Sequence, residues 1–184
     1  MLGPILEGER VRLVPPRVEY FPAYERWFAD MAVTRYLLFR FPFTPKAEGE
    51  WLENVGKDPH QVVWAIVIKH NDRLIGGTSL EHIDWRNRRA ESGTIVGEKD
   101  EWGKGYASEA MRLRTRYAFR ELGLETVTTR VVIDNEASRR GLERAGYRQA
   151  GVLRHHWFVD GRWHDAWIGE ILRDEWEATQ ETTP

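Results

Sequence analysis

A strand, a glycine loop and a helix follow one another between residues 91 and 122, and this order constrains the fold more than any other stretch. Residues 91–97 form a β-type run, and Gly103 and Gly105 follow it. The next residues have apolar side chains at helical spacing, namely Ala107, Ala110, Met111, Tyr117, Ala118 and Leu122. The glycines let the loop turn its N–H groups one way, and the first helical turn adds unsatisfied donors. The segment therefore predicts an anion site fit for a pyrophosphate, with added charge from Lys104.

The spacing of this loop excludes the two standard nucleotide loops. Gly103, Lys104 and Gly105 are too close together for a P-loop, and Tyr106 follows them. A third glycine at dinucleotide-fingerprint spacing is also missing from the sequence. Taken alone, the loop is equally compatible with a plain connection between two elements.

A second unit of the same kind follows at residues 126–147. A β-branched run over 126–133 leads to Asn135, which is a typical helix N-cap. A short helical segment then ends at Gly146, a typical C-terminal stop. A strand, a polar cap and a short helix thus follow the first helical segment.

Three sequence blocks carry a resemblance to a known family. They are residues 102–110, residues 135–138 together with 145–147, and residues 151–154 together with 159–163. With these blocks, residues 8–173 resemble the GNAT superfamily of acyl-CoA-dependent N-acetyltransferases, most closely its Rim-type (RimJ/RimL-like) branch, which includes ribosomal-protein N-terminal acetyltransferases. The resemblance implies an α/β fold with a mixed, mostly antiparallel sheet, in which two parallel strands splay apart and about four helices flank the sheet.

The rest of the chain suits one such domain over residues 1–173, followed by a polar, frayed tail over 174–184. We expect a first strand at residues 5–14 with Ile5, Val11 and Leu13 in the core. A helix with an aromatic stripe follows at 21–28, and Thr44 caps another helix. Antiparallel strands are predicted at 62–69, 73–83 and 88–97, and Asp160-Gly161 predicts a type I′ hairpin turn.

Composition narrows the function classes. The 184 residues carry a net charge of −2, which argues against a general nucleic-acid binder. The absence of cysteine from the sequence excludes disulfides and thiolate chemistry. The longest apolar run, residues 62–68, is too short to span a membrane, and no signal peptide is visible, so a cytoplasmic location is predicted. Adjacent histidines at 155 and 156 alternate between faces of a strand, so we expect no metal site from them, His164 or Asp165.

The resemblance implies acetyl-CoA as the co-substrate and no metal. The backbone at the end of the strand is expected to pair with the pantetheine arm, the glycine loop to cradle the pyrophosphate, and the second helix start to contact the cofactor. The residues implied are Ile95, Val96, Gly97, Trp102, Gly103, Lys104, Gly105, Tyr106, Ala107, Asn135 and Ser138. The loop differs from the usual family pattern at Trp102, where Gln or Arg is frequent. A backbone N–H near Val96 is the expected donor to the oxyanion.

The predicted proton-transfer groups are Glu91 and Ser138. Strand alternation puts Glu91 on one face with Gly93 and Ile95, four residues before the first pantetheine position, which matches the general base of some family members. A salt-bridge role for Glu91 stays open, and Glu81 and His82 are alternative bases. The family's usual acidic tyrosine is replaced by Leu142, so Ser138, as in the Rim-type branch, is the alternative acid, although it is equally suited to helix capping.

The acceptor side is predicted from an aromatic segment at residues 33–43. We expect Tyr36, Phe39 and Phe41 to line an acceptor groove together with Glu81 and His82. The alternative is that the segment is a loop packed on the core. The leading hypothesis is an N-acetyltransferase acting on a peptide N-terminal α-amine or a small-molecule amine. A non-catalytic acyl-CoA-binding module and a transferase of another acyl-CoA are the alternatives. The oligomeric state, including a homodimer, stays open.

Overall fold

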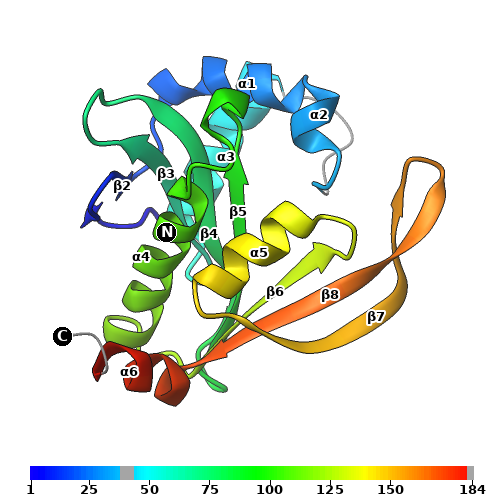
Figure 1. Cartoon of the computed structure of the whole chain (residues 1–184). Coiled ribbons are helices and arrows are strands. Elements are labelled where there is room, and N and C mark those ends of the chain that lie inside the picture. The colour runs from blue at the N-terminus through cyan, green and yellow to red at the C-terminus, as the bar shows by residue number, and fades with distance from the viewer. Residues whose placement is uncertain (38–43, 182–184) are drawn as a thin grey trace.

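The structure is a computed structural model, which describes residues 1–37 and 44–181. An eight-stranded sheet and six α-helices make up the described chain (Figure 1). The strands are β1 (Leu6–Glu7), β2 (Val11–Val14), β3 (Val62–Ile68), β4 (Leu74–Asp84), β5 (Arg89–Val96), β6 (Thr126–Val132), β7 (Arg148–Val159) and β8 (Arg162–Leu172). The helices are α1 (Phe21–Phe28), α2 (Met31–Thr34), α3 (Pro45–Lys57), α4 (Tyr106–Arg120), α5 (Glu136–Arg144) and α6 (Arg173–Glu181). Two 3-10 turns lie at Val18–Tyr20 and Lys99–Glu101.

The sheet has one parallel junction, between β5 and β6, in its described part. The strand order is β1-β2-β3-β4-β5-β6-β8-β7, and the remaining neighbours pair antiparallel. The parallel pairing covers only three positions and ends at Glu91↔Thr128, although both strands continue beyond it. Figure 1 shows β5 and β6 diverging from this point. The predicted sheet with two splayed parallel strands is therefore confirmed.

Different helices cover the two faces of the central strands. On one face, Arg114 of α4 donates hydrogen bonds to the Oγ1 atoms of Thr78 in β4 and Thr94 in β5, which are paired across the strands. On the other face, a Cβ added to Gly77 in β4 would lie 3.6 Å from the hydroxyl of Tyr24 in α1. Helix α3 contacts α1 and so covers this second face. The divergence of β5 and β6 thus opens a passage between an α4 face and an α1/α3 face.

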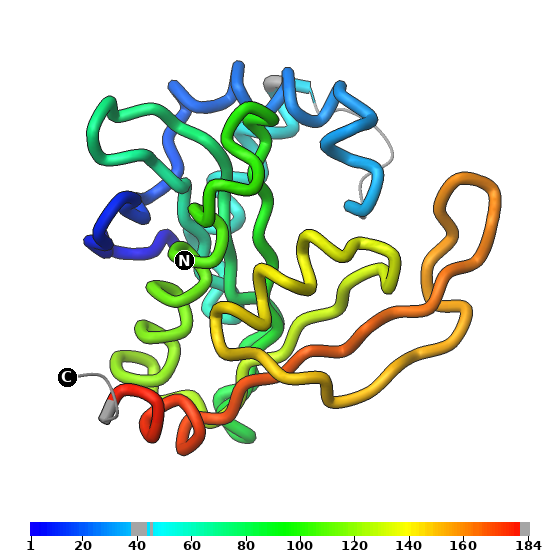
Figure 2. The backbone as a smooth tube through the Cα atoms, in the orientation of Figure 1, coloured from blue at the N-terminus to red at the C-terminus, as the bar shows by residue number. Residues whose placement is uncertain are grey.

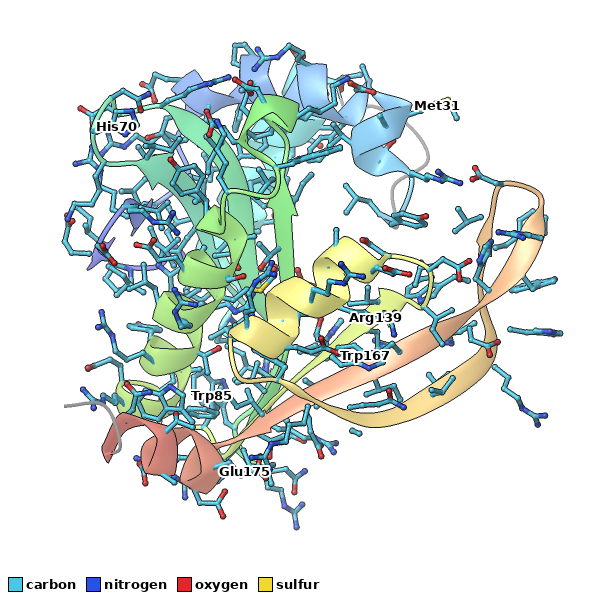
Figure 3. The ribbon with its side chains drawn as sticks, in the orientation of Figure 1. Met31, His70, Trp85, Arg139, Trp167 and Glu175 are labelled. Carbon is cyan, nitrogen blue, oxygen red and sulfur yellow. The ribbon has the colours of Figure 1, made fainter. Side chains whose placement is uncertain are left out.

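The core lies between the sheet and these helices. Every residue of β3 is buried, as expected for a β-branched run in the middle of a sheet. Trp167 of β8, labelled in Figure 3, is only 1% exposed and belongs to the same core cluster. Beyond this core, β7 and β8 continue as a two-stranded ribbon that extends away from the body of the molecule (Figure 2).

Several local predictions are confirmed. The side chain of Thr44 accepts a hydrogen bond from the N–H of Ala47 and so caps α3. Asp160 and Gly161 have positive φ angles of 49° and 76° at the tip of the β7–β8 hairpin, as a type I′ turn requires. The strands expected at residues 62–69, 73–83 and 88–97 are β3, β4 and β5.

The first predicted strand is wrong in two respects. Residues 5–14 form two short strands, β1 and β2, that pair antiparallel, and Ile5 is 58% exposed because it precedes the paired positions. Val11 and Leu13 are buried as expected.

The predicted frayed tail is also a helix over most of its length. Helix α6 begins at Arg173, and its Trp176 is 6% exposed against Phe119, with 5.5 Å between the ring centroids. The single buried tryptophan attaches this otherwise polar segment to the core, which the composition of the tail did not suggest. With α6 and the four-residue α2, the described chain has six helices, compared with the predicted number of about four. Phe39 and Phe41, with the rest of the predicted lid at 38–43, lie outside the described residues.

Candidate active site

The glycine loop has the geometry that its sequence predicts. Gly103 and Gly105 have φ angles of +75° and +87°, and Gly105 is the N-cap of α4, so no side chain caps this helix. A Cβ added to Gly103 would meet nothing within 4 Å in the described chain. The N–H groups of the first turn of α4 are therefore open to an anion from solvent.

The charge near this loop differs from expectation. Lys104 Nζ lies 2.9 Å from Glu101 Oε2, and this hydrogen bond raises the pKa of Lys104. Its charge is therefore shared with a neighbouring carboxylate. A second cation, Arg10, donates from Nη1 to the carbonyl of Lys104 at 2.9 Å and pairs with Glu109. Arg10 precedes the loop by more than 90 residues, so only the tertiary structure reveals it.

A cleft of about 530 Å³ opens where β5 and β6 diverge. Its walls come from α1, α3, α4, α5 and the strands β3 to β6, together with Trp157 of β7. Predicted site residues that line it are Tyr36, Glu81, Glu91, Ile95, Asn135 and Ser138. Within the described chain, its lining residues include none of positions 102–107, so the glycine loop lies outside the cleft.

The open edge of β5 is formed by alternate residues. The N–H of Gly97 donates to the carbonyl of Ile75 at 2.8 Å, so Gly97 and, by alternation, Ile95 direct their backbone groups toward β4. The backbone groups of Thr94 and Val96 therefore point to the opposite edge of β5, where β6 has diverged and no longer pairs with it. The indole of Trp102 donates to the Val96 carbonyl at 2.7 Å, which places Trp102 against this open edge. Of the three predicted pantetheine positions, Val96 is the one whose backbone groups point away from β4, whereas Ile95 is the one that lines the cleft.

The start of α5 forms another wall of the cleft. Asn135 caps the helix by accepting a hydrogen bond from the N–H of Ser138 at 3.2 Å. The side chain of Ser138 is half-buried and lines the cleft. Leu142, which stands at the position of the family's tyrosine, is 2% exposed and lines the cleft one turn later. The capping role is thus held by Asn135, and Ser138 is one of the residues that line the cleft.

Two glutamates lie on the α1/α3 face of the cleft. Glu81 and Glu91 are directly paired across β4 and β5. Glu91 Oε2 lies 2.5 Å from Arg130 Nη2 of β6, and Glu81 accepts from Ser79 Oγ at 2.7 Å. The ion pair with Arg130 links the two diverging strands and fixes the direction of Glu91. His82 lies 3.8 Å from Glu91, but its side chain is 73% exposed, so it faces solvent more than the cleft.

The sequence did not single out Arg114, which is 1% exposed and lines the cleft. Its Nη1 donates to Thr78, Thr94 and the Gly93 carbonyl at 2.7–2.9 Å, and its Nη2 donates to the Tyr147 hydroxyl at 3.0 Å. All of these partners are neutral. An arginine among the buried positions of α4 was the available sequence signal, because buried arginines are rare unless they have a structural or chemical role.

Glu48 of α3 is the second residue that the sequence did not single out. It lines the cleft, is 5% exposed, and burial, with a contribution from Glu25, raises its pKa to about 7. Neither of its carboxylate oxygens has a hydrogen-bond partner among residues 1–37 and 44–181. The sequence places Glu48 in the first turn of a capped helix, where a glutamate is ordinary, so its burial was not predictable.

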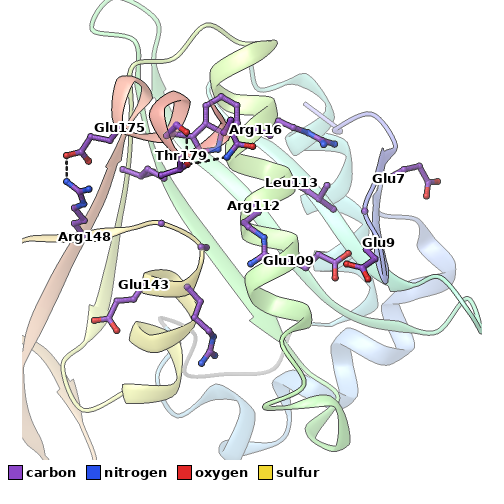
Figure 4. Close-up of a pocket in the computed structure, with 17 residues that line it drawn as sticks. Glu7, Glu9, Glu109, Arg112, Leu113, Arg116, Glu143, Arg148, Glu175 and Thr179 are labelled. Carbon is purple, nitrogen blue, oxygen red and sulfur yellow. Dashed lines mark hydrogen bonds and ion pairs between the residues drawn. The ribbon is translucent and has the colours of Figure 1, made fainter. Parts of the chain in front are cut away.

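A second cavity of about 570 Å³ lies between α4, α6 and β1 (Figure 4). Its lining residues carry both signs of charge, and Arg148 and Glu175 form an ion pair within it. It contains none of the predicted site residues. Among the described residues, no group of three or more metal-binding side chains occurs, and no helix is long and apolar enough to cross a membrane.

The cleft at two diverging parallel strands, beside a glycine loop that opens a helix, is the arrangement expected of an acyl-CoA-dependent N-acetyltransferase. Residues 10–148 match a family model described as an acetyltransferase (GNAT) domain. The chain belongs to the GNAT acetyltransferase family. Members of this family use acetyl-CoA as co-substrate, and the chain is accordingly an acyl-CoA-dependent enzyme that acts as an N-acetyltransferase.

Three relatives illustrate the similarity. The uncharacterized N-acetyltransferase p20 of Bacillus licheniformis is 28% identical over 93% of this chain and 97% of its own length. The Bacillus subtilis protein named "putative ribosomal N-acetyltransferase YdaF" is 37% identical over 59% of this chain and 58% of its own. The crystal structure of spermidine N-acetyltransferase from Vibrio cholerae, in complex with CoA and spermine, has a TM-score of 0.84 at 20% identity and covers 92% of this chain and 99% of that one, which supports the fold.

Proposed function

We propose that the chain transfers the acetyl group of acetyl-CoA to a primary amine in the cleft between β5 and β6, by direct attack within a ternary complex. The observation that carries this proposal is the divergence of the two parallel strands after Glu91↔Thr128. It leaves the Val96 edge of β5 unpaired and opens a passage between the α4 face and the α1/α3 face. In this proposal, acetyl-CoA binds on the α4 face and the amine binds on the α1/α3 face.

The thioester substrate is assigned to the side of α4 and α5. Gly103 and Gly105 have positive φ angles and leave the first turn of α4 uncapped, which fits a pyrophosphate. The edge of β5 at Thr94 and Val96 offers backbone groups to the pantetheine amides, with the Val96 carbonyl already accepting from Trp102. Thr94, Asn135 and Ser138 line the cleft. These contacts are a proposal, as are the roles predicted for residues 102–107.

In the proposed reaction, the amine nitrogen attacks the carbonyl carbon of the thioester. A C–N bond forms, the C–S bond breaks, the amine loses a proton, and the thiolate gains one. We assign the amine proton to Glu91, which lines the cleft and is oriented by Arg130. Ser138 delivers a proton to the thiolate, and the N–H of Val96 stabilises the oxyanion. Arg114, a buried cation at the floor of the cleft, adds favourable potential for the developing negative charge.

The acceptor is proposed to be either a protein N-terminal α-amine or the amine of a small molecule. The name of YdaF refers to ribosomal acetylation, which supports the Rim-type alternative. The Vibrio cholerae structure contains spermine, and a spermidine N(1)-acetyltransferase from the same organism is 28% identical over 56% of this chain, which supports the small-molecule alternative. The cytoplasmic location, the single domain and a homodimer stay predictions from the sequence.

A second candidate function is a non-catalytic acyl-CoA-binding module. The observation in its favour is Leu142, which stands at the position of the family's tyrosine and has no proton to give. Amine-dependent release of thiol separates the two candidates. We expect release of free CoA when the protein is mixed with acetyl-CoA and a panel of N-terminal peptides, polyamines and aminoglycosides. Binding of acetyl-CoA without release for any member of the panel would favour the binding module.

A further inference from the structure

Glu48 is a buried carboxylate without a partner in the described chain. It is 5% exposed, and both of its oxygens lie buried without a hydrogen bond to residues 1–37 or 44–181. Buried carboxylates are costly unless they are paired, and buried polar atoms without partners are rare in folded proteins. Because Glu48 lines the cleft, a ligand that enters the cleft can supply the missing partner.

The side chains around Glu48 favour a positively charged ligand. Tyr24, Phe28, Tyr36 and Trp51 line the same cleft, and Tyr24 and Phe28 stack with their ring centroids 6.0 Å apart. Aromatic ring faces attract ammonium groups, and more strongly where water is excluded. A carboxylate beside aromatic rings is therefore well suited to an ammonium group.

The charges on the α1/α3 face favour a cation as well. Three carboxylates line the cleft, those of Glu48, Glu81 and Glu91. Arg130 pairs with Glu91, whereas the other cleft arginine, Arg114, is bound to the opposite face of the sheet. Two of the three carboxylates on this face thus have no ion-pair partner among the described residues.

Glu48 and Glu91 line the same cleft from two different elements. Glu48 belongs to α3, whereas Glu91 lies on β5 at the point where the strands diverge. The cleft volume of about 530 Å³ falls in the range that holds a whole small ligand rather than one ammonium group. An acceptor with amines at both ends suits a cleft that both carboxylates line.

We propose that Glu48, with Tyr24, Phe28, Tyr36 and Trp51, forms a subsite for a positively charged group of the acceptor other than the amine that is acetylated. The acceptor class is therefore a di- or polycationic amine. This inference rests on the proposed N-acetyltransferase function and specifies its substrate. A second positive charge on the acceptor also lowers the pKa of the reacting amine, which reduces the work required of the base.

The test compares 1,4-diaminobutane with butylamine, which has the same carbon chain but a single amine. We expect the wild-type protein to have a KM for the diamine about 10- to 100-fold below that for butylamine, because the subsite adds one charge-assisted hydrogen bond. In Glu48→Gln this preference disappears, because KM for the diamine rises to that for butylamine. Glu53→Gln, an exposed glutamate on the same helix, is the matched control and retains the preference.

Three outcomes would overturn the subsite. Equal KM values of the wild-type protein for the two amines would exclude it. An equal loss of kcat for both amines in Glu48→Gln would instead make Glu48 a base. A preference that survives in Glu48→Gln would place the cation elsewhere.

Equilibrium binding separates failure of the subsite from failure of the proposed function. Calorimetric titration of 1,4-diaminobutane into wild type and Glu48→Gln needs no turnover. Weaker binding to folded Glu48→Gln, verified by circular dichroism, supports the subsite even if no amine is acetylated. Equal binding to both proteins rejects the subsite even if butylamine and the diamine are both turned over.

Discussion

Glu91 is the residue on which the proposed proton transfer depends. Its carboxylate lies in the cleft and pairs with Arg130, in an exposed ion pair that contributes at most about 1 kcal/mol to stability. Glu91→Gln is therefore expected to fold normally and to bind acetyl-CoA as wild type does. We predict a fall in kcat of about 10²- to 10⁴-fold, measured by thiol release at saturating amine. A kcat within about twofold of wild type would exclude Glu91 as the base.

Glu48 predicts a specific pH dependence of stability. Burial, with a contribution from Glu25, raises its pKa from 4.5 to about 7. Between these two values the folded protein holds more protons than the unfolded chain, so the free energy of unfolding falls as pH rises through this window. Glu48→Gln has no such titration, and its stability relative to wild type should increase by about 3 kcal/mol across the window. Urea unfolding of both proteins at about pH 4 and pH 8 measures this difference. An equal change in the free energy of unfolding between the two pH values for wild type and Glu48→Gln would contradict the burial of an ionisable Glu48.

At the scale of elements, the glycine loop tests the acetyl-CoA site. Gly105 has a φ of +87°, and an added Cβ would lie 3.1 Å from Arg10 Nη2 and crowd the start of α4. We predict that Gly105→Ala raises the Kd for acetyl-CoA about 10- to 100-fold through loss of a charge-assisted hydrogen bond.

Gly161 provides a matched control for Gly105→Ala. It has a φ of +76° at the hairpin tip, and an added Cβ would meet nothing within 4 Å among the described residues, so Gly161→Ala imposes similar backbone strain of about 1–2 kcal/mol away from the loop. Calorimetry should show that Gly161→Ala has the same Kd for acetyl-CoA as the wild-type protein. Equal Kd values for the two variants would place the cofactor elsewhere.

Helix α6 gives a prediction about stability. Trp176 is 6% exposed and packs on Phe119, with the guanidinium of Arg120 5.3 Å from its ring centroid. We expect Trp176→Ala to lower the free energy of unfolding by about 3 kcal/mol. Trp163→Ala, at a position that is 58% exposed on the β7–β8 hairpin, should lower it by only about 0.5–1.5 kcal/mol, the contribution of its ring pair with Phe158. Similar denaturant midpoints for the two variants would mean that α6 does not pack on the core.

At the scale of the whole molecule, the sequence predicts those features of the structure that depend on residues close together in the chain. The glycine loop, the Asn135 and Thr44 caps and the Asp160-Gly161 turn depend on residues close together in the chain, and the structure contains all of them. The roles of Glu48, Arg114 and Arg10 depend on partners or burial set by distant segments. Arg10, for example, contacts Lys104 across 94 positions. Such residues carry only a local signal of helix or strand, so their place in the site was not predictable.

In the proposed mechanism, the two substrates meet across the diverging strands, with no covalent step on the protein. Initial rates of thiol release, measured while acetyl-CoA and an amine are varied together, test this claim most directly. We predict intersecting double-reciprocal lines, and no release of thiol until an amine is added. Parallel lines, with a burst of thiol in the absence of amine, would show an acetylated protein intermediate and contradict direct attack in a ternary complex.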